Sequence, residues 1–286
     1  MQLRLRNETD PLQALIVGIA QDRPANPHGN NPKILENMQK GNLPTEAELV
    51  AEVNGLAQLL ADEGVQVLRP DNIPNQDQIF ARDIGFVIDD TFVRAGMRKP
   101  NRRIEVSGIQ HHIEQMERVL TPPEGVFVEG GDVILHNDYV FVGLGERTNA
   151  AGVQFLKDHF PQKEIIGLPL VVSEDPYQNV LHLDCAFQPV GAGQAILYEA
   201  GFVEKPQAIL DIFGEKSLIR VGQPEMYAMY PNVFSVRPDL VLIEEQFTWL
   251  ADQLHAHGIR TRSLPYEKVS RFGGLLRCST LPLFRQ

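Results

Sequence analysis

The chain repeats one pattern: two short apolar segments joined by a tight turn, followed by a longer segment with helical spacing of apolar residues. Five segments share the strand–turn–strand part, at residues 84–96, 132–145, 185–200, 232–246 and 273–284. Alternating apolar residues interrupted by Asp, Asn, Gly or Pro are typical of β-hairpins. The fifth hairpin ends the chain, and the apolar segment 12–20 is available to complete its unit.

Helical patterns lie between the hairpins. Residues 45–63 carry Leu49, Val53, Leu56, Leu59 and Leu60 on one stripe, which predicts a helix with one buried face. Further helices are expected near residues 103–119, 148–159, 206–213 and 244–257.

The residue at the head of each hairpin recurs at a nearly constant interval. These heads are Asp83, Asp132, Asp184, Asn232 and Cys278, separated by 49, 52, 48 and 46 residues. A period close to fifty residues indicates a repeat architecture. We therefore predict an α/β fold of five ββαβ units closed into a ring, a β/α propeller in which closure protects the strand edges. The alternative is an ordinary α/β domain whose hairpins are evenly spaced.

Composition narrows the class of protein. The 286 residues contain 26 Lys and Arg against 37 Asp and Glu, a net charge of −11, so nucleic acid is a poor partner. No linker-like stretch divides the chain, and we treat residues 1–286 as a single domain. Neither a signal peptide nor a membrane span is recognisable, and two cysteines do not make a disulfide framework. A cytoplasmic location without a membrane partner is expected.

A ring of repeats would point equivalent hairpin heads at a common axis. Asp83, Asp132, Asp184 and Cys278 would then meet, although they are far apart in sequence. Carboxylates buried together are costly unless donors or a bound cation satisfy them. This arrangement favours a site for a cationic ligand.

His182 and Asp184 are two residues apart, so in a strand they would share one face while Leu183 packs inside. A histidine beside a carboxylate can serve as a general acid or base next to a charge clamp. A lone histidine at a strand end is more often structural, but the repeat position of Asp184 favours the functional interpretation.

Cys278 is a candidate nucleophile because neighbouring cations such as Arg277 lower a thiol pKa. Cys185, on the opposite face from Asp184, is interpreted as an inert core residue. Glu129-Gly130-Gly131-Asp132 and Phe80-Ala81-Arg82-Asp83, with Asp77 before it, form two further acidic clusters. Each by itself is also compatible with a surface turn or a surface salt bridge.

Neither a metal nor a cofactor is expected. Acidic residues with one histidine lack the second imidazole or thiolate pair that zinc sites commonly have. His111 and His112 lie in a predicted helix and are interpreted as surface residues. Gly191-Ala192-Gly193 lacks the third glycine of a dinucleotide-binding loop.

Taken together, the motifs resemble the guanidine-modifying enzymes of the pentein superfamily: arginine deiminases, dimethylarginine dimethylaminohydrolases and amidinotransferases. The matching pieces run in family order: Phe80 to Asp83, EGGD at 129–132, FVGLGERTN at 141–149, HLD at 182–184 and GGLLRCST at 273–280. The family fold is a five-unit β/α propeller, in agreement with the spacing above.

The resemblance implies roles for individual residues. Cys278 would attack the guanidinium carbon, His182 would protonate the leaving nitrogen and later activate water, and Glu129 would orient His182. Asp83 and Asp184 would hold guanidinium nitrogens, Asp77 would contact the substrate, and Arg147 would bind the substrate carboxylate. Arg98, Arg102 and Arg103 remain open as a second anchor.

The subfamily signals conflict. Asp184 resembles deiminases and amidinotransferases, which bind an unsubstituted guanidino end, whereas Asp77 and the segments around FVGLGERTN and GLL-x-C resemble methylarginine hydrolases. We predict a hydrolase acting on the free guanidino group of arginine or a relative, a small cationic substrate. An amidinotransferase, a methylarginine hydrolase and a non-catalytic ribosome-binding pentein are the alternatives, the last disfavoured by the charge and by the Cys/His/Asp set. The sequence leaves open whether the chain forms a homodimer and whether one or two nitrogens are released.

Overall fold

The computed structural model of the chain describes residues 1–24 and 31–286. The described residues form five sheets of three strands, and every sheet has the same topology. An antiparallel hairpin supplies two strands, and the third strand runs parallel to the middle one. The predicted repeat of hairpin, helical segment and third strand is therefore confirmed as a set of five like units.

Four of the sheets follow one another along the chain. They consist of β3 (Gly85–Ile88), β4 (Thr91–Arg94) and β5 (Val119–Leu120); β6 (Val133–His136), β7 (Tyr139–Leu144) and β8 (Glu164–Pro169); β9 (Phe187–Val190), β10 (Gln194–Leu197) and β11 (Leu218–Arg220); and β12 (Phe234–Arg237), β13 (Leu240–Glu244) and β14 (Arg260–Leu264). Each first strand begins within three residues of a predicted hairpin head.

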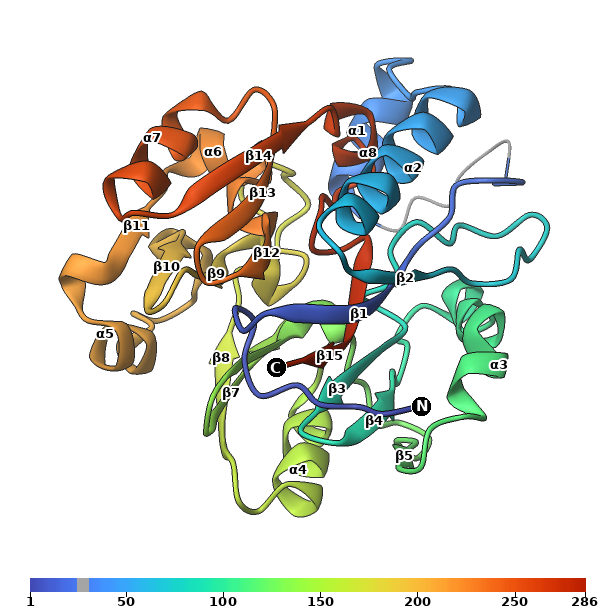
Figure 1. The fold of residues 1–286 in the computed structure, drawn as a ribbon, viewed down its shortest axis with the longest axis horizontal. Coiled ribbons are helices and arrows are strands. Elements are labelled where there is room, and N and C mark those ends of the chain that lie inside the picture. Colours follow the sequence, from blue (N-terminus) through green and yellow to red (C-terminus); the bar gives the residue numbers. More distant parts are fainter. Residues whose placement is uncertain (25–30) are drawn as a thin grey trace.

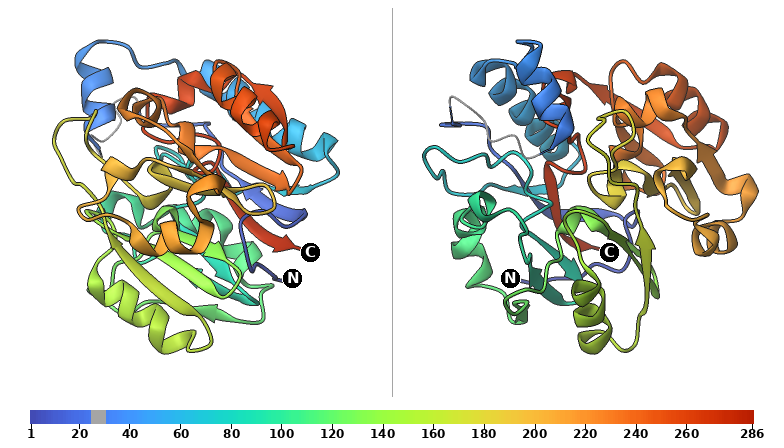
Figure 2. Two further views of the ribbon diagram at one scale, coloured as in Figure 1. Left: turned by 90° about the vertical axis from the view of Figure 1, so that its left-hand side faces the viewer. Right: turned by 180° about the vertical axis from the view of Figure 1, so that it is seen from behind.

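The fifth sheet joins the two ends of the chain. Strand β15 (Thr280–Arg285) pairs antiparallel with β1 (Leu12–Val17), and β1 runs parallel to β2 (Gln66–Leu68). The prediction that segment 12–20 completes the last hairpin is thus confirmed. Figures 1 and 2 show both termini on the same side of the molecule.

Tight hairpin turns depend on residues that accept a left-handed backbone. Asp89 (φ 52°), Asn137 (φ 56°) and Gly191 (φ 64°) lie in the turns after β3, β6 and β9. Asp, Asn and Gly tolerate this conformation better than other residues do, which explains why the turns fall where these residues stand.

Most predicted helices are present. They are α2 (Glu46–Asp62), α4 (Ala150–His159), α5 (Gln207–Phe213) and α7 (Thr248–Ala256), and Figures 1 and 2 show them at the periphery of the molecule. Thr45 and Glu48 form a capping box that begins α2. Helix α7 begins later than residue 244 because β13 continues to Glu244. Shorter helices are α1 (Pro32–Gln39), α6 (Gln223–Tyr227) and α8 (Glu267–Ser270).

The single helix expected over residues 103–119 is wrong. This segment forms a 3-10 turn at Glu105–Ile109 and one helical turn, α3 (Gln110–Ile113), before β5. Gly108 packs so tightly that a Cβ there would lie 2.8 Å from the carbonyl oxygen of Asp71. The backbone NH of Asp71 also donates to the Gly108 carbonyl. This tertiary contact outweighs the helical pattern of the sequence.

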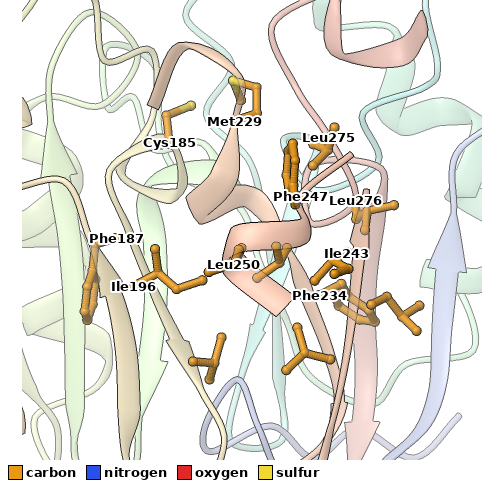
Figure 3. Packing of buried hydrophobic residues seen from close by; sticks show 14 of the residues in the cluster. Cys185, Phe187, Ile196, Met229, Phe234, Ile243, Phe247, Leu250, Leu275 and Leu276 are labelled. Atoms are coloured by element: carbon orange, nitrogen blue, oxygen red, sulfur yellow. The ribbon is translucent and has the colours of Figure 1, made fainter. Parts of the chain in front are cut away.

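The strands pack against the helices through apolar side chains. Figure 3 shows one such region, with Phe187 and Ile196 from β9 and β10 on one side and Phe234 and Ile243 from β12 and β13 on the other. Leu250 of α7 belongs to the same buried cluster. The apolar core thus fixes the strands, and the polar hairpin heads that precede them are left to face one another.

Candidate active site

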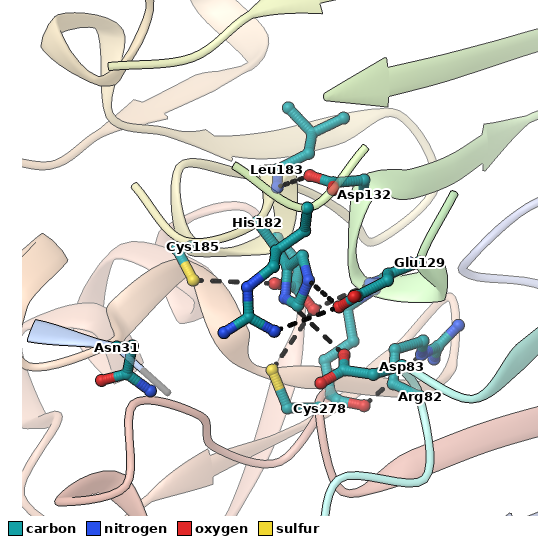
Figure 4. Close-up of polar contacts among 12 residues, drawn as sticks. Asn31, Arg82, Asp83, Glu129, Asp132, His182, Leu183, Cys185 and Cys278 are labelled. Carbon is teal, nitrogen blue, oxygen red and sulfur yellow. Dashed lines mark hydrogen bonds and ion pairs between the residues drawn. The ribbon is translucent and has the colours of Figure 1, made fainter. Parts of the chain in front are cut away.

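The hairpin heads are buried, and three of them, Asp184, Asn232 and Cys278, contact one another directly. The Cys278 sulfur lies 3.5 Å from Asp184 Oδ2, and Asn232 Nδ2 donates to that sulfur at 3.2 Å. Asp132 accepts the backbone NH of Leu183, and Asp83 Oδ1 lies 3.6 Å from His182 Nδ1. Figure 4 shows His182, Glu129, Asp83 and Cys278 in one group. The structure therefore brings together the residues that the repeat spacing predicted would meet.

His182 lies between two carboxylates. Its Nε2 is 3.0 Å from Glu129 Oε2, and its Nδ1 faces Asp83. Burial favours the neutral imidazole, but the charges of Asp83 and Asp132 and the bond to Glu129 outweigh burial and raise the pKa of His182 to about 9. The pKa of Glu129 is lowered to about 2, because the contacts with His182 and Arg147 outweigh its burial. At neutral pH the pair is an imidazolium–carboxylate ion pair that can donate a proton.

Glycines make this arrangement sterically accessible. A Cβ on Gly131 would lie 2.6 Å from His182 Nδ1, and a Cβ on Gly130 would lie 2.1 Å from the Arg82 carbonyl oxygen. Because its two glycines have no side chain, the EGGD backbone can pack directly against the His182 ring and the Arg82 backbone. Its interpretation as a surface turn is wrong, since both Glu129 and Asp132 are fully buried.

The expectation that His182 and Asp184 share a strand face is also wrong. His182 is extended, but Leu183–Cys185 form a 3-10 turn, so the two side chains have different partners. Asp184 Oδ2 accepts Arg277 Nη1 at 2.9 Å in addition to the Cys278 thiol, while its Oδ1 lies 3.7 Å from the Cys185 sulfur. Cys185 is therefore beside Asp184 and not on an opposite face.

Arg277 does not activate the neighbouring cysteine as expected. Its guanidinium binds Glu8 at 2.9 Å, Asp184 at 2.9 Å and the Val133 carbonyl at 2.8 Å, all in a fully buried position. Burial, followed by the charges of Asp184 and Asp83, raises the pKa of the Cys278 thiol well above its usual range. Without a cationic ligand the sulfur is therefore protonated at neutral pH.

One oxygen of Asp83 accepts a hydrogen bond, and the other has only the longer ion pair with His182. Arg102 Nη1 donates to Asp83 Oδ2 at 2.7 Å and binds Glu105 with its other nitrogens at 2.8 Å each. Asp83 Oδ1 is buried and has no hydrogen bond among the described residues. Of the three arginines that the sequence left open, Arg102 is the one whose guanidinium contacts a hairpin head. Arg82 is buried as well, 3.9 Å from Glu8, so a surface salt bridge with Asp83 is wrong.

The remaining predicted substrate contacts are paired within the protein. Asp77 binds Arg23 at 2.6 Å, and Arg23 lies over the Phe272 ring. Arg147 is buried with Nη1 3.3 Å from Glu129. The roles of Asp77 and Arg147 in binding a substrate stay predictions. His112 is buried against the Arg69 carbonyl, which corrects its interpretation as a surface residue.

Asp83, Glu129 and His182 also form a geometric metal set, with ligand atoms within 4.8 Å of one another. Both carboxylates already contact arginine guanidinium groups, and the imidazole carries a proton at neutral pH. A metal ion at these three residues would have to displace the imidazole proton and compete with the arginines. The set therefore suits proton transfer better than metal binding.

Two residues of the site were missed from the sequence. Asn232 was identified as a hairpin head but given no role, although it had the same repeat position as the aspartates. Glu8 is 1% exposed and lies between Arg277 and Arg82. No motif marks it, because its partners are more than 70 residues away in the sequence.

Among the described residues, no helix is both long enough and apolar enough to span a membrane.

Comparison with known proteins places these features in a family. The chain matches the family described as N,N dimethylarginine dimethylhydrolase, eukaryotic, over residues 26–285. The uncharacterized protein YkgA of Bacillus subtilis is 29% identical over 80% of this chain and 78% of YkgA. An arginine deiminase of Listeria monocytogenes is 27% identical over 76% of this chain, which spans 62% of that enzyme.

Two solved structures share the fold. The N-terminal domain of ArgZ, an arginine dihydrolase from cyanobacteria, superposes with a TM-score of 0.85 at 19% identity, covering 96% of this chain and 98% of that domain. SxtG, an amidinotransferase from Microseira wollei, superposes with a TM-score of 0.82 at 18% identity, covering 99% and 97%. The chain belongs to the N,N dimethylarginine dimethylhydrolase family, within the pentein superfamily of guanidine-modifying proteins.

Proposed function

We propose that the protein is a hydrolase that cleaves a C–N bond in the guanidino group of arginine or an arginine-like compound, with Cys278 as the nucleophile. The observation that carries the proposal is the placement of the Cys278 sulfur beside Asp184, in the same buried group as Asp83 and His182. Two carboxylates, a thiol and an imidazolium are the groups that cleavage of a flat cationic group needs.

Asp83 and Asp184 would hold the substrate guanidinium. Each gives one oxygen to an internal arginine, Arg102 or Arg277. The other oxygen of Asp83 accepts no hydrogen bond from the described residues and lies 3.6 Å from His182 Nδ1, and that of Asp184 lies 3.7 Å from the Cys185 sulfur. A substrate NH at Asp83 Oδ1 would satisfy a buried acceptor that otherwise costs free energy, about 1–3 kcal/mol.

Substrate charge would activate the nucleophile. The carboxylates of Asp184 and Asp83 are among the causes that raise the pKa of Cys278. A guanidinium between them offsets their charge, so the thiol can release its proton to solvent and become a thiolate. The uncharged product would no longer provide this stabilisation.

The chemical steps then follow from the acid–base state of His182. The thiolate forms a bond to the guanidinium carbon, and one C–N bond breaks as the His182 imidazolium donates its proton to the leaving nitrogen. This gives an amidino-thioether on Cys278 and a neutral imidazole. The imidazole takes a proton from water as the water oxygen bonds to the carbon. The C–S bond then breaks and the hydroxyl proton of the adduct passes to solvent, which releases a ureido product and a free thiolate.

The relatives support this reaction class without selecting one member of it. ArgZ is an arginine dihydrolase and SxtG is an amidinotransferase, while the family match is to methylarginine hydrolases. We infer an unsubstituted guanidino end because Asp184, an acidic residue that pairs with NH groups, stands where methylarginine hydrolases carry a non-acidic residue. We also infer that the five sheets close into a ring, since β1 and β15 join the chain ends in one unit.

A substrate panel tests the proposal. Purified protein is incubated with arginine, agmatine, methylated arginines and other guanidino compounds, and ureido product and ammonia are measured. We expect turnover of at least one unsubstituted compound and none with Cys278→Ser. Turnover of methylated arginines alone would contradict the proposed specificity. A requirement for an added amine acceptor, with transfer of the amidino group to it, would identify an amidinotransferase instead.

A further inference from the structure

Asn232 is a hairpin head for which the proposed reaction has no role. It is fully buried, and both ends of its side-chain amide are used. Its Oδ1 accepts the backbone NH groups of Leu275 and Cys278, each at 3.0 Å, and its backbone carbonyl accepts the NH of Arg277 at 3.1 Å. Asn232 therefore holds the loop that carries the nucleophile at three points.

These bonds also fix the orientation of the amide. If the amide were flipped, its NH2 group would face two NH donors, which is unfavourable. Nδ2 must therefore point the other way, where it lies 3.2 Å from the Cys278 sulfur and 3.3 Å from the Asp184 carbonyl oxygen. The sulfur receives an NH donor whose direction is set by the backbone and not by the sulfur itself.

Two carboxylates and a second thiol near the sulfur disfavour a thiolate. Asp184 lies 3.5 Å from it, and Asp83 and Cys185 act in the same direction. Arg277, the nearest cation in the sequence, has its guanidinium bound to Glu8 and Asp184. The hydrogen bond from Asn232 acts in the opposite direction.

We propose that Asn232 is a further catalytic residue, whose side-chain NH stabilises the Cys278 thiolate while its carbonyl oxygen holds the Leu275–Cys278 loop. The proposal rests on the proposed function, in that Cys278 is the nucleophile. A hydrogen bond to a charged acceptor is stronger than one to a neutral acceptor, so the NH favours the thiolate over the thiol. Asn232 would also support the C–S bond-breaking step, in which the thiolate is the leaving group.

Two substitutions distinguish the role of the amide nitrogen from that of the amide oxygen. Asn232→Asp keeps an oxygen that can accept the two backbone NH groups but replaces the donor with a carboxylate oxygen. Asn232→Leu has a similar shape and adds no charge, and it removes both functions. Asn37→Asp is the matched control, because Asn37 is also a buried asparagine with its Nδ2 on backbone carbonyls, Lys33 and Arg271.

The test measures alkylation of Cys278 by iodoacetamide between pH 7 and 9.5, quantified by mass spectrometry of the Cys278 peptide. Below the thiol pKa this rate follows the thiolate concentration, so loss of a donor that shifts the pKa by one unit lowers it about tenfold. We expect Asn232→Asp and Asn232→Leu to react about tenfold more slowly than wild type, and Asn37→Asp to stay within about twofold.

Loop holding alone predicts a different result. The neutral Asn232→Leu would then react faster than the wild type, because the loosened loop exposes the sulfur. That outcome would overturn the role of the NH group. Asn232→Asp is slowed in either case by the charge of its carboxylate beside the sulfur, so the sign of the change in Asn232→Leu decides. The alkylation assay needs no substrate, so its result tests the role of Asn232 alone. Failure of the substrate panel would instead contradict the proposed function.

Discussion

Cys185 and Cys278 occupy comparable surroundings but differ in their repeat position and in the donor at the sulfur. Each is 3% exposed, and their sulfurs lie against opposite oxygens of the same carboxylate, at 3.7 Å and 3.5 Å from Asp184. Burial raises the thiol pKa of both. The difference is that Cys278 is a hairpin head that receives the Asn232 NH, whereas Cys185 lies one residue past a head and lines a small cavity with Leu181 and Met229.

This comparison shows that burial and a neighbouring carboxylate do not define a nucleophile. Both features are shared by the two thiols. The repeat position and the donor at the sulfur are not, because a shift of one residue along the chain turns the side chain toward different partners. The predictions below test how far the two cysteines differ, from the largest expected effect to the smallest.

The sharpest contrast is substitution of each cysteine by serine. Cys278→Ser should lower kcat by at least about 10⁴-fold, because a hydroxyl at neutral pH is a far weaker nucleophile than a thiolate. Cys185→Ser should retain kcat within about fivefold. Ammonia and ureido product are measured for both, with circular dichroism to check folding. Equal losses for the two variants would contradict the assignment of the nucleophile.

Glu129 is expected to keep His182 in the imidazolium form, which donates the proton in the reaction at Cys278. Glu129→Gln removes a charge that raises the pKa of His182 and leaves a neutral acceptor in place of a charged one, so kcat should fall by about 10²–10³-fold. In the wild type, kcat/KM should decline as the pH rises past about 9, where His182 loses its proton. The decline should begin at lower pH in Glu129→Gln. An alkaline limb that does not move would remove His182 as the general acid.

Asp184 touches both sulfurs, so its substitution tests what the shared carboxylate does. Asp184→Asn should lower kcat/KM for an unsubstituted guanidino substrate by about 10²-fold, since it loses a charge-assisted contact. It also leaves Arg277 with one carboxylate and should destabilise the fold by about 3 kcal/mol. Glu8→Gln is the comparison: it unpairs the other side of Arg277 without touching a sulfur, and should cost similar stability with a smaller loss of kcat/KM. An unchanged kcat/KM in Asp184→Asn would exclude a clamp role.

The His182 ion pairs should also appear in the pH dependence of stability. The pKa of His182 is raised from 6.5 to about 9 in the folded protein, so protonation stabilises the fold fully below pH 6.5. This contribution, about 3 kcal/mol, should be lost as the pH rises through 9. Urea unfolding at pH 6.5 and 9.5 measures it. Glu129→Gln should show a smaller difference between the two pH values, and an equal difference would mean that other groups cause it.

The smallest effect is expected at Asp77. Its carboxylate is held by Arg23, and we predict that Asp77→Asn raises KM by about threefold with kcat nearly constant. Steady-state kinetics with the best substrate of the panel measures both constants. A large fall in kcat would mean that Asp77 acts in the chemical step and not only in substrate binding.

Much of the fold followed from the chain itself, because its signals are local. The alternation of apolar residues, the Asx and Gly turns and the fifty-residue period were enough to locate the hairpins and to join the two chain ends in one unit. The segment 103–119 was misjudged because its outcome depends on the packing of Gly108 against a distant loop. Local pattern and tertiary contact disagree there, and the contact decides.

The site divides in the same way. The sequence by itself predicted that Asp83, Asp132, Asp184 and Cys278 meet, since equal spacing along repeated units puts them at equivalent places. Only the tertiary structure decided the partners: Arg277 binds Glu8 and Asp184 instead of activating the thiol, and Asn232 donates to the sulfur. A hydrogen bond depends on the direction and distance of single atoms, which a repeat period does not specify.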